Sequence, residues 1–379
     1  MRYDELVNFY FEMWSSKGHI SQLLLGPPGT GKSSIAISLS ERITKAVQGS
    51  NPSAPPAICS LLDLSTKNKE DIVGLPSVKN GLSEFIPFGW LNEVTDPDAY
   101  GVICLDDLPS ASQSVQTGAR QLILERRVDD QRISDGILIM VTGNRREDKC
   151  AALTLASNFR NSVCSLSLDL DFDLWADWYG KEIGLAPVIP SFLRYRPTHF
   201  SSLPKQADDR GQFATPRTWA MLGKCLDIAQ KQGILTDVAS GLVGAGPATE
   251  LCAFINVKSQ LVDPAQVLKD PKAAMPDPVT CLERPDKAYA MTTGLGEVAA
   301  SWMTDPGKKR KDTALRFLQA VGWVTQDNRE YIATAVSTFT GNQGEIKDLV
   351  KAATTNPDDE LVKGVIDFLA DCFNTGGEK

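Results

Sequence analysis

The stretch Gln22-Leu-Leu-Leu-Gly-Pro-Pro-Gly-Thr-Gly-Lys-Ser-Ser-Ile-Ala-Ile-Ser-Leu39 decides how the first half of the chain is interpreted. It opens with a short apolar run that is typical of a buried strand, and it closes with apolar residues at helical spacing. Between these, residues 26–33 fit the pattern G-x-x-x-x-G-K-[ST] in full. The stretch therefore predicts a strand, a phosphate-binding loop and a helix in direct succession.

The chemistry of this loop depends on its glycines, on the helix that follows and on two polar side chains. Glycines let successive backbone N–H groups turn inward around a β-phosphate, and the helix N-terminus adds partial positive charge. Lys32 would reach the β- and γ-phosphate oxygens, and the Ser33 hydroxyl would contact Mg²⁺. The residues that we expect to bind nucleotide are Gly26, Pro27, Pro28, Gly29, Thr30, Gly31, Lys32 and Ser33.

Four more apolar runs follow the first one, Ser21–Leu25, and complete the pattern of an α/β core. They are Ala57–Leu64, Gly101–Leu105, Gly136–Val141 and Val163–Leu168. Each run is followed by a loop and most by a stretch of helical period, as in parallel sheets that carry helices on both faces. The sequence therefore predicts a five-stranded parallel sheet.

An acidic pair, Asp106 and Asp107, ends the third apolar run. Carboxylates at this place in a phosphate-binding fold hold magnesium and polarise an attacking water. We expect Asp106, with Ser33, to hold the metal and Asp107 to act on the water. Aspartates at a strand end can also be solvated surface or a helix cap, but the complete phosphate loop favours the catalytic interpretation.

The fourth apolar run ends in Thr-Gly-Asn144. An amide side chain can donate and accept at the same time, so Asn144 could orient a water beside a γ-phosphate. A Gly-Asn turn explains the fragment equally well. The chain lacks the Asn-Lys-x-Asp element that reads guanine, and this favours adenine.

The strand pattern stops after about Asp171, and helical spacing replaces it. We expect three regions: a nucleotide-binding α/β core over 1–170, a small helical lid over 171–245, and a mostly helical region of unknown role over 246–379.

Charge and composition narrow the possible partners. The 39 Lys and Arg against 47 Asp and Glu give a formal net charge of −8, so the chain has no overall basic field for nucleic acid, although a local patch stays open. The two histidines, His19 and His199, exclude a His-rich metal centre. The eight cysteines form no Cys-x-x-Cys pair and are typical of reduced thiols.

Hydropathy predicts the location of the protein. No uncharged apolar run approaches the roughly 20 residues of a membrane helix, and the first residues are acidic where a signal peptide is basic. We expect a cytoplasmic protein with no membrane partner.

Several motifs in a fixed order together resemble one protein family. They are GPPGTGKS at 26–33, LDDLPSA at 105–111, QLILERRV at 121–128, TGNR at 142–145 and ATPRTW at 214–219. This combination is similar to AAA+ ATPases of the MoxR type, in the helix-2-insert branch near dynein-related ATPases, from bacteria or phages. The resemblance covers about residues 18–245.

The resemblance implies a homo-hexamer or related ring that binds ATP and Mg²⁺ at subunit interfaces and remodels or chaperones a partner protein. A von Willebrand factor A domain protein is the partner class that it suggests. Residues 26–33 would be Walker A, Asp106 and Asp107 Walker B, and Asn144 sensor 1. Arg217 would be sensor 2, and Arg160 the arginine finger that acts on the neighbouring subunit.

The chain departs from the family pattern at two places. Asp107 stands where the family usually has Glu, so fast hydrolysis is in question. The order Phe159-Arg160 reverses the usual Arg-Phe, so Arg145 and Arg146 are alternatives for the finger. Two other functions stay open: a DNA-directed AAA+ motor or helicase-loader-like protein, and a nucleotide-switched scaffold with little hydrolysis.

The segment from Asp71 to Trp90 occupies the place of the family's inserted hairpin. Its apolar side chains could line a pore and grip a protein, or they could pack on the core; these are Phe85, Ile86, Phe88 and Trp90. For Arg194, Tyr195 and Arg196, lid packing and a nucleotide or interface contact are equally open.

Overall fold

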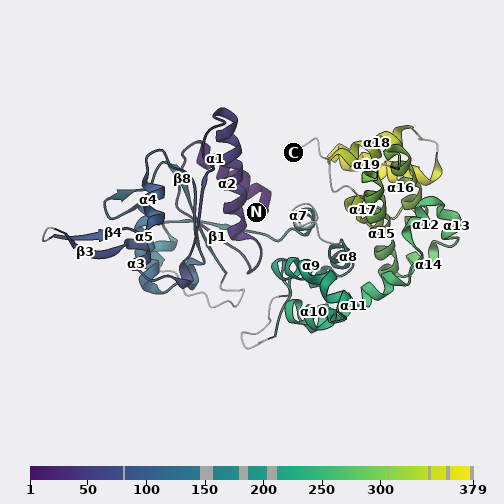
Figure 1. The fold of residues 1–379 in the computed structure, drawn as a ribbon, viewed down its shortest axis with the longest axis horizontal. Coiled ribbons are helices and arrows are strands. Elements are labelled where there is room, and N and C mark those ends of the chain that lie inside the picture. Colours follow the sequence, from purple (N-terminus) through teal and green to yellow (C-terminus); the bar gives the residue numbers. More distant parts are fainter. Residues whose placement is uncertain are drawn as a thin grey trace. The chain divides into compact units, whose positions relative to one another are not determined.

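The computed structural model describes residues 1–79, 82–145, 157–178, 187–202, 211–305, 307–339, 343–355 and 359–375, and Figure 1 shows its ribbon. The chain divides into two compact units. Unit 1 contains Met1–Asp171, and unit 2 contains Phe172–Ser202 and Gly211–Lys379.

A five-stranded parallel sheet forms the centre of unit 1, in the order β2-β5-β8-β1-β9. Each of the five apolar runs found in the sequence supplies one strand, and the inner strands β1, β5 and β8 are buried almost throughout. The predicted α/β fold class is therefore confirmed. The strands are β1 (Gln22–Leu25), β2 (Ile58–Asp63), β5 (Tyr100–Asp106), β8 (Gly136–Gly143) and β9 (Cys164–Ser167).

Helices cover both faces of this sheet, and each face has its own core. On one face, Leu138 and Met140 of β8 pack with α1 (Tyr3–Ser15) and α2 (Lys32–Ser50). On the other face, Ile139 and Val141 pack with α5 (Gln113–Glu125) and α4 (Gly89–Thr95). Successive side chains of β8 thus point alternately into the two cores, because side chains in a strand repeat every two residues.

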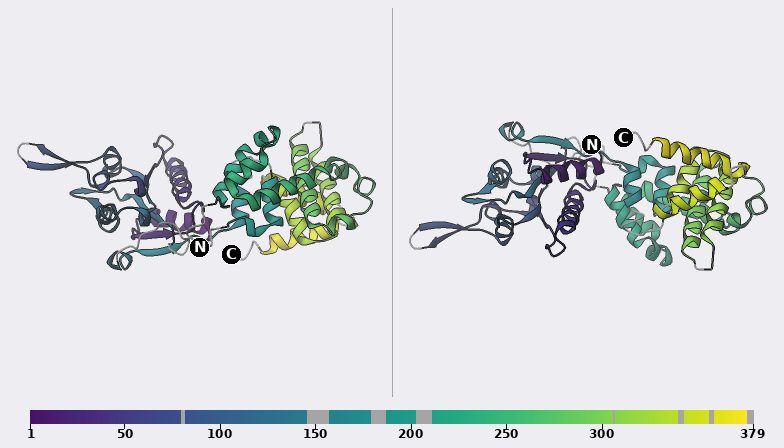
Figure 2. Two further views of the ribbon diagram at one scale, coloured as in Figure 1. Left: turned by 90° about the horizontal axis from the view of Figure 1, so that it is seen from below. Right: turned by 90° about the horizontal axis from the view of Figure 1, so that it is seen from above.

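A two-stranded antiparallel hairpin, β3 (Leu75–Lys79) and β4 (Leu82–Ile86), extends away from the rest of unit 1 in both views of Figure 2. Phe85 and Ile86 are exposed by 51% and 56%, so they do not pack on the core. Trp90, by contrast, packs against the core that contains α4 and α5. Its indole N–H donates to the carbonyl of Asp71 at 3.2 Å. The predicted cluster is thus divided between two environments.

The remaining elements of unit 1 are short. They are η1 (Leu64–Thr66), α3 (Glu70–Val73), η2 (Leu108–Ser110), β6 (Arg127–Val128), β7 (Gln131–Arg132) and α6 (Ser157–Arg160).

The described elements of unit 2 are all helical, which agrees with the fold class predicted from the sequence. They are α7 (Phe172–Trp178), α8 (Val188–Tyr195), η5 (Pro197–His199), α9 (Pro216–Lys231), α10 (Leu235–Val243), α11 (Ala245–Ser259), α12 (Pro264–Lys269), α13 (Pro271–Ala274), α14 (Val279–Leu282), α15 (Pro285–Thr304), α16 (Arg310–Thr325), α17 (Arg329–Phe339), α18 (Gln343–Thr355) and α19 (Glu360–Thr375). Among the described helices, none has the length and apolarity to cross a membrane.

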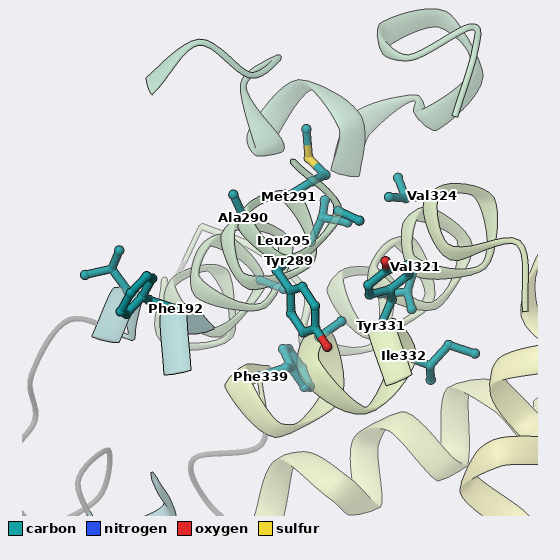
Figure 3. Packing of buried hydrophobic residues seen from close by; sticks show 14 of the residues in the cluster. Phe192, Tyr289, Ala290, Met291, Leu295, Val321, Val324, Tyr331, Ile332 and Phe339 are labelled. Atoms are coloured by element: carbon teal, nitrogen blue, oxygen red, sulfur yellow. The ribbon is translucent and has the colours of Figure 1, made fainter. Parts of the chain in front are cut away.

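One hydrophobic cluster runs through unit 2. It joins Phe192 of α8 and Trp219 of α9 to Leu295 of α15 and Phe317 of α16. Figure 3 shows Leu295 and Tyr289 of α15 in this cluster, together with Tyr331 of α17. The expected separation of a lid over 171–245 from a region over 246–379 stays a prediction, although the buried side chains of both belong to this cluster.

Helices α16 and α19 approach each other at Gly322. A Cβ atom on Gly322 would lie 1.6 Å from the carbonyl oxygen of Leu361 in α19. Backbone atoms cannot move aside as the end of a flexible side chain can, so only glycine fits at this contact.

We expect Gly322→Ala to lower the free energy of unfolding by about 3 kcal/mol, because α19 must shift to accommodate the methyl group. Gly241→Ala in α10 is the matched control, since a Cβ there meets nothing within 4 Å and alanine favours helix by about 1 kcal/mol. Urea unfolding followed by circular dichroism measures both variants. Equal stability of the two variants would contradict the close packing of α16 and α19.

Candidate functional site

The glycine-rich loop of residues 26–33 joins β1 to α2 at the carboxyl edge of the sheet. Gly29 and Gly31 have φ values of 73° and 89°, in the left-handed region that only glycine adopts without strain. The Thr30 hydroxyl donates to the carbonyl of Pro27 at 2.9 Å and closes the turn. α2 begins directly after Gly31, so the free N–H groups of its first turn lie at the end of the loop.

Lys32 places its ammonium group inside this loop. The side chain is 8% exposed, and its Nζ donates to the carbonyls of Gly26 and Pro27 at 2.9 and 2.8 Å. It also donates to Oδ1 of Asn144 at 2.9 Å. The cation is therefore held between the loop and the end of β8.

Asp106, the last residue of β5, is held on both carboxylate oxygens. The Ser33 hydroxyl of α2 donates to Oδ2 at 2.5 Å, and the Thr142 hydroxyl of β8 donates to Oδ1. Behind Asp106, burial and then the charge of Asp106 raise the pKa of the Cys104 thiol well above its usual value. That thiol stays neutral beside the carboxylate.

Asp107 follows Asp106 in a left-handed backbone conformation with φ of 55°, which is uncommon for a residue with a side chain. Its Oδ1 accepts a hydrogen bond from Nδ2 of Asn144 at 3.3 Å. Asn144 therefore uses both ends of its amide, one toward Lys32 and one toward Asp107. Its side chain is part of the site rather than only of a Gly-Asn turn.

Thr142 is a residue of this site that sequence reasoning missed. It is fully buried, it donates to Asp106, and it accepts from the backbone N–H of Asp107 at 3.3 Å. The sequence contains one signal for this role. Thr142 carries a hydroxyl in an otherwise apolar run, two residues before Asn144, and residues two apart in a strand point to the same face.

The donor set at this edge fits a nucleoside triphosphate with magnesium. Mg²⁺ prefers oxygen ligands such as carboxylates and hydroxyls, and the Ser33 hydroxyl and the Asp106 carboxylate lie together. The loop supplies backbone N–H groups and one ammonium, which are the groups that bind phosphate.

The sequence assigns candidate roles to four arginines, Arg145, Arg146, Arg160 and Arg217. Arg145 donates to the carbonyl of Leu168 at 3.1 Å and to the Ser167 hydroxyl, and so is engaged with the end of β9. Arg160 is exposed at the end of α6. Arg217 is exposed in the first turn of α9 in unit 2, and Arg146 lies outside the described residues.

The basic residues of α8 and the turn after it form ion pairs within unit 2. Arg194 lies 2.9 Å from Asp173, and Arg196 lies 2.7 Å from Glu250. Tyr195 stacks on Phe254 at 5.9 Å between ring centroids. These contacts agree with packing inside the helical unit.

Comparisons with known proteins give only distant similarity. No protein-family model and no curated protein matches the chain. Among solved structures, the chain is similar to the Aeropyrum pernix ORC2 protein in its ADPNP and ADP complexes, at 11% identity and a TM-score of 0.39 over 70% of this chain and 71% of that chain. It is also similar to a RuvB mutant from Thermotoga maritima, at 13% identity and a TM-score of 0.37 over 77% of this chain and 87% of that chain. For PCH-2 from C. elegans the identity is 12% and the TM-score 0.34, over 66% of each chain. Because the identities and TM-scores are this low, the roles of the site residues are argued from the geometry of this chain alone.

Proposed function

We propose that this chain binds and hydrolyses ATP as an AAA+ protein and works as an oligomeric ring that remodels a partner protein. The observation that carries the proposal is the meeting of three elements at one sheet edge. α2 supplies Lys32 and Ser33, β5 supplies Asp106 with Asp107 directly after it, and Asn144 follows β8. A cation, two carboxylates and an amide beside a glycine-rich loop are the groups that phosphoryl transfer to water requires.

Each residue has a distinct part in this mechanism. The loop N–H groups and Lys32 would hold the phosphates, and Ser33 and Asp106 would hold Mg²⁺, which neutralises phosphate charge when bound. Asp107 would orient a water and accept its proton, and Asn144 would fix the direction of the Asp107 carboxylate. Catalysis then comes from positioning and charge rather than from a covalent intermediate.

The exposed apolar hairpin supports a protein partner. Leu75, Val78, Phe85 and Ile86 are each at least half exposed on β3 and β4. Large apolar side chains gathered on one projecting element are typical of protein interaction sites. The partner class that the sequence suggests, a von Willebrand factor A domain protein, belongs to this proposal.

A second candidate is a scaffold that binds ATP and hydrolyses it slowly. Asp107 favours it, because its side chain is one methylene shorter than the glutamate usual in AAA+ ATPases and already accepts a hydrogen bond from Asn144.

The ring that we propose also needs two arginines. We assign the arginine finger, which acts on the nucleotide of the neighbouring subunit, to Arg160. We assign the sensor 2 role to Arg217 of unit 2.

Lys32→Ala tests the nucleotide site. We expect the affinity for a fluorescent ATP analogue to fall by about 100-fold, since the variant removes a charged donor directed into the loop. Lys45→Ala is the matched control, because Lys45 is exposed on the same helix. Unchanged affinity in Lys32→Ala would mean that the nucleotide does not bind at this loop.

Asp107→Asn separates a motor from a scaffold. The variant should bind ATP normally and hydrolyse it about 100-fold more slowly, because the amide cannot accept a proton from water. Asp130→Asn, at an exposed position between β6 and β7, serves as the control for steady-state turnover. If Asp107→Asn keeps the wild-type rate, Asp107 is not catalytic and the scaffold is favoured.

Arg160→Ala tests the ring. Turnover should fall by up to about 1000-fold while ATP binding stays, as for other NTPases that use an arginine finger. Mixing Arg160→Ala subunits with Asp107→Asn subunits should restore part of the activity, because one interface then joins an intact site to an intact finger. Mixed oligomers confirmed by native mass spectrometry without any recovery would remove the finger role from Arg160.

A further inference from the structure

The Thr-Gly-Asn sequence at the end of β8 has a structural requirement at each position. Thr142 and Asn144 lie on the same face, two residues apart, and both contact the acidic pair. Gly143 lies between them, and a Cβ there would lie 2.4 Å from Cδ of Pro109. The lack of a side chain lets η2 pack directly on β8, and this packing brings Asp107, which precedes η2, against Thr142 and Asn144.

The hydrogen-bonding role of the Thr142 hydroxyl is fixed by its two neighbours. The backbone N–H of Asp107 can only donate, so the hydroxyl oxygen accepts at 3.3 Å. Its single proton is then available to the Oδ1 oxygen of Asp106. A side chain that is 0% exposed has no water to replace either partner. One hydroxyl therefore connects both aspartates.

These contacts constrain where the two carboxylates can point. With Oδ1 of Asp106 occupied by Thr142, Oδ2 is the oxygen directed at Ser33, the other expected metal ligand. The bond to the Asp107 amide holds the left-handed turn at that residue, from which its carboxylate reaches Asn144. Without the hydroxyl, Asp106 keeps only the bond from Ser33, and the Asp107 N–H loses its bond to the Thr142 oxygen.

We propose that Thr142 is a positioning residue that sets the metal-binding orientation of Asp106 and the backbone turn of Asp107. This inference rests on the proposed function, because it assumes that Asp106 binds Mg²⁺. Thr142 acts through the two aspartates that it contacts.

The test compares Thr142→Val, which keeps the shape but removes the hydroxyl, with Thr142→Ser, which keeps the hydroxyl. In the full chain, binding of a fluorescent ATP analogue is titrated with Mg²⁺ and repeated in EDTA. Thr142→Val should raise the Mg²⁺ midpoint by about 10- to 100-fold, as for other residues that hold metal ligands, and leave affinity in EDTA within about 2-fold. Thr142→Ser should stay within about 3-fold of the wild type in both.

Thr334→Val in α17 is the matched control, since Thr334 is 1% exposed and its hydroxyl donates to the Glu330 carbonyl of its own helix. It should change neither measurement. Thr142→Ala replaces Thr142→Val if the latter does not fold.

An unchanged Mg²⁺ midpoint, an equal loss of affinity in EDTA, or a Thr142→Ser variant as defective as Thr142→Val would each overturn the role of Thr142. A wild-type protein that binds the analogue neither with Mg²⁺ nor in EDTA would refute the proposed function, and this inference with it.

Discussion

The position of β8 between β1 and β5 is the constraint on which the candidate site depends. The glycine-rich loop follows β1 and the acidic pair ends β5, but these strands are not neighbours. Two strand spacings, about 10 Å, separate them. Ser33 reaches Asp106 directly from α2, and Asn144 at the end of β8 joins Lys32 to Asp107, so α2 and β8 together connect the loop to the acidic pair.

Burial of charge gives this arrangement its rigidity. Taking an ammonium group out of water is costly unless oxygen acceptors surround it. Lys32 has Gly26, Pro27 and Asn144 as acceptors, and Asp106 has a hydroxyl donor on each oxygen. All these groups belong to unit 1.

The strands and the loop could be predicted from the sequence, because continuous apolar runs and a full phosphate-loop pattern have direct physical causes. The strand order could not, since an apolar run such as Gly101–Leu105 carries no information about its neighbours. Thr142 was missed because threonine is also a common β-former, and nothing local indicates that its hydroxyl faces a carboxylate.

The apolar residues between Asp71 and Trp90 were grouped by their nearness in sequence. The structure separates them because β4 ends at Ile86 and α4 begins at Gly89, so Trp90 turns toward the core while Phe85 stays on the hairpin. The roles proposed for Arg160 and Arg217 involve other subunits or another unit, and no local pattern in the sequence determines such contacts.

The pairing of β1 has a consequence for how the protein folds. Leu23 pairs with Val141 of β8 and Leu24 with Leu166 of β9, so β1 has no partner until most of unit 1 has been synthesised. Contacts so distant in sequence are slow to form. During translation, the apolar side chains of β1 would therefore remain without their strand neighbours until β8 and β9 have emerged, which leaves apolar surface exposed on the nascent chain.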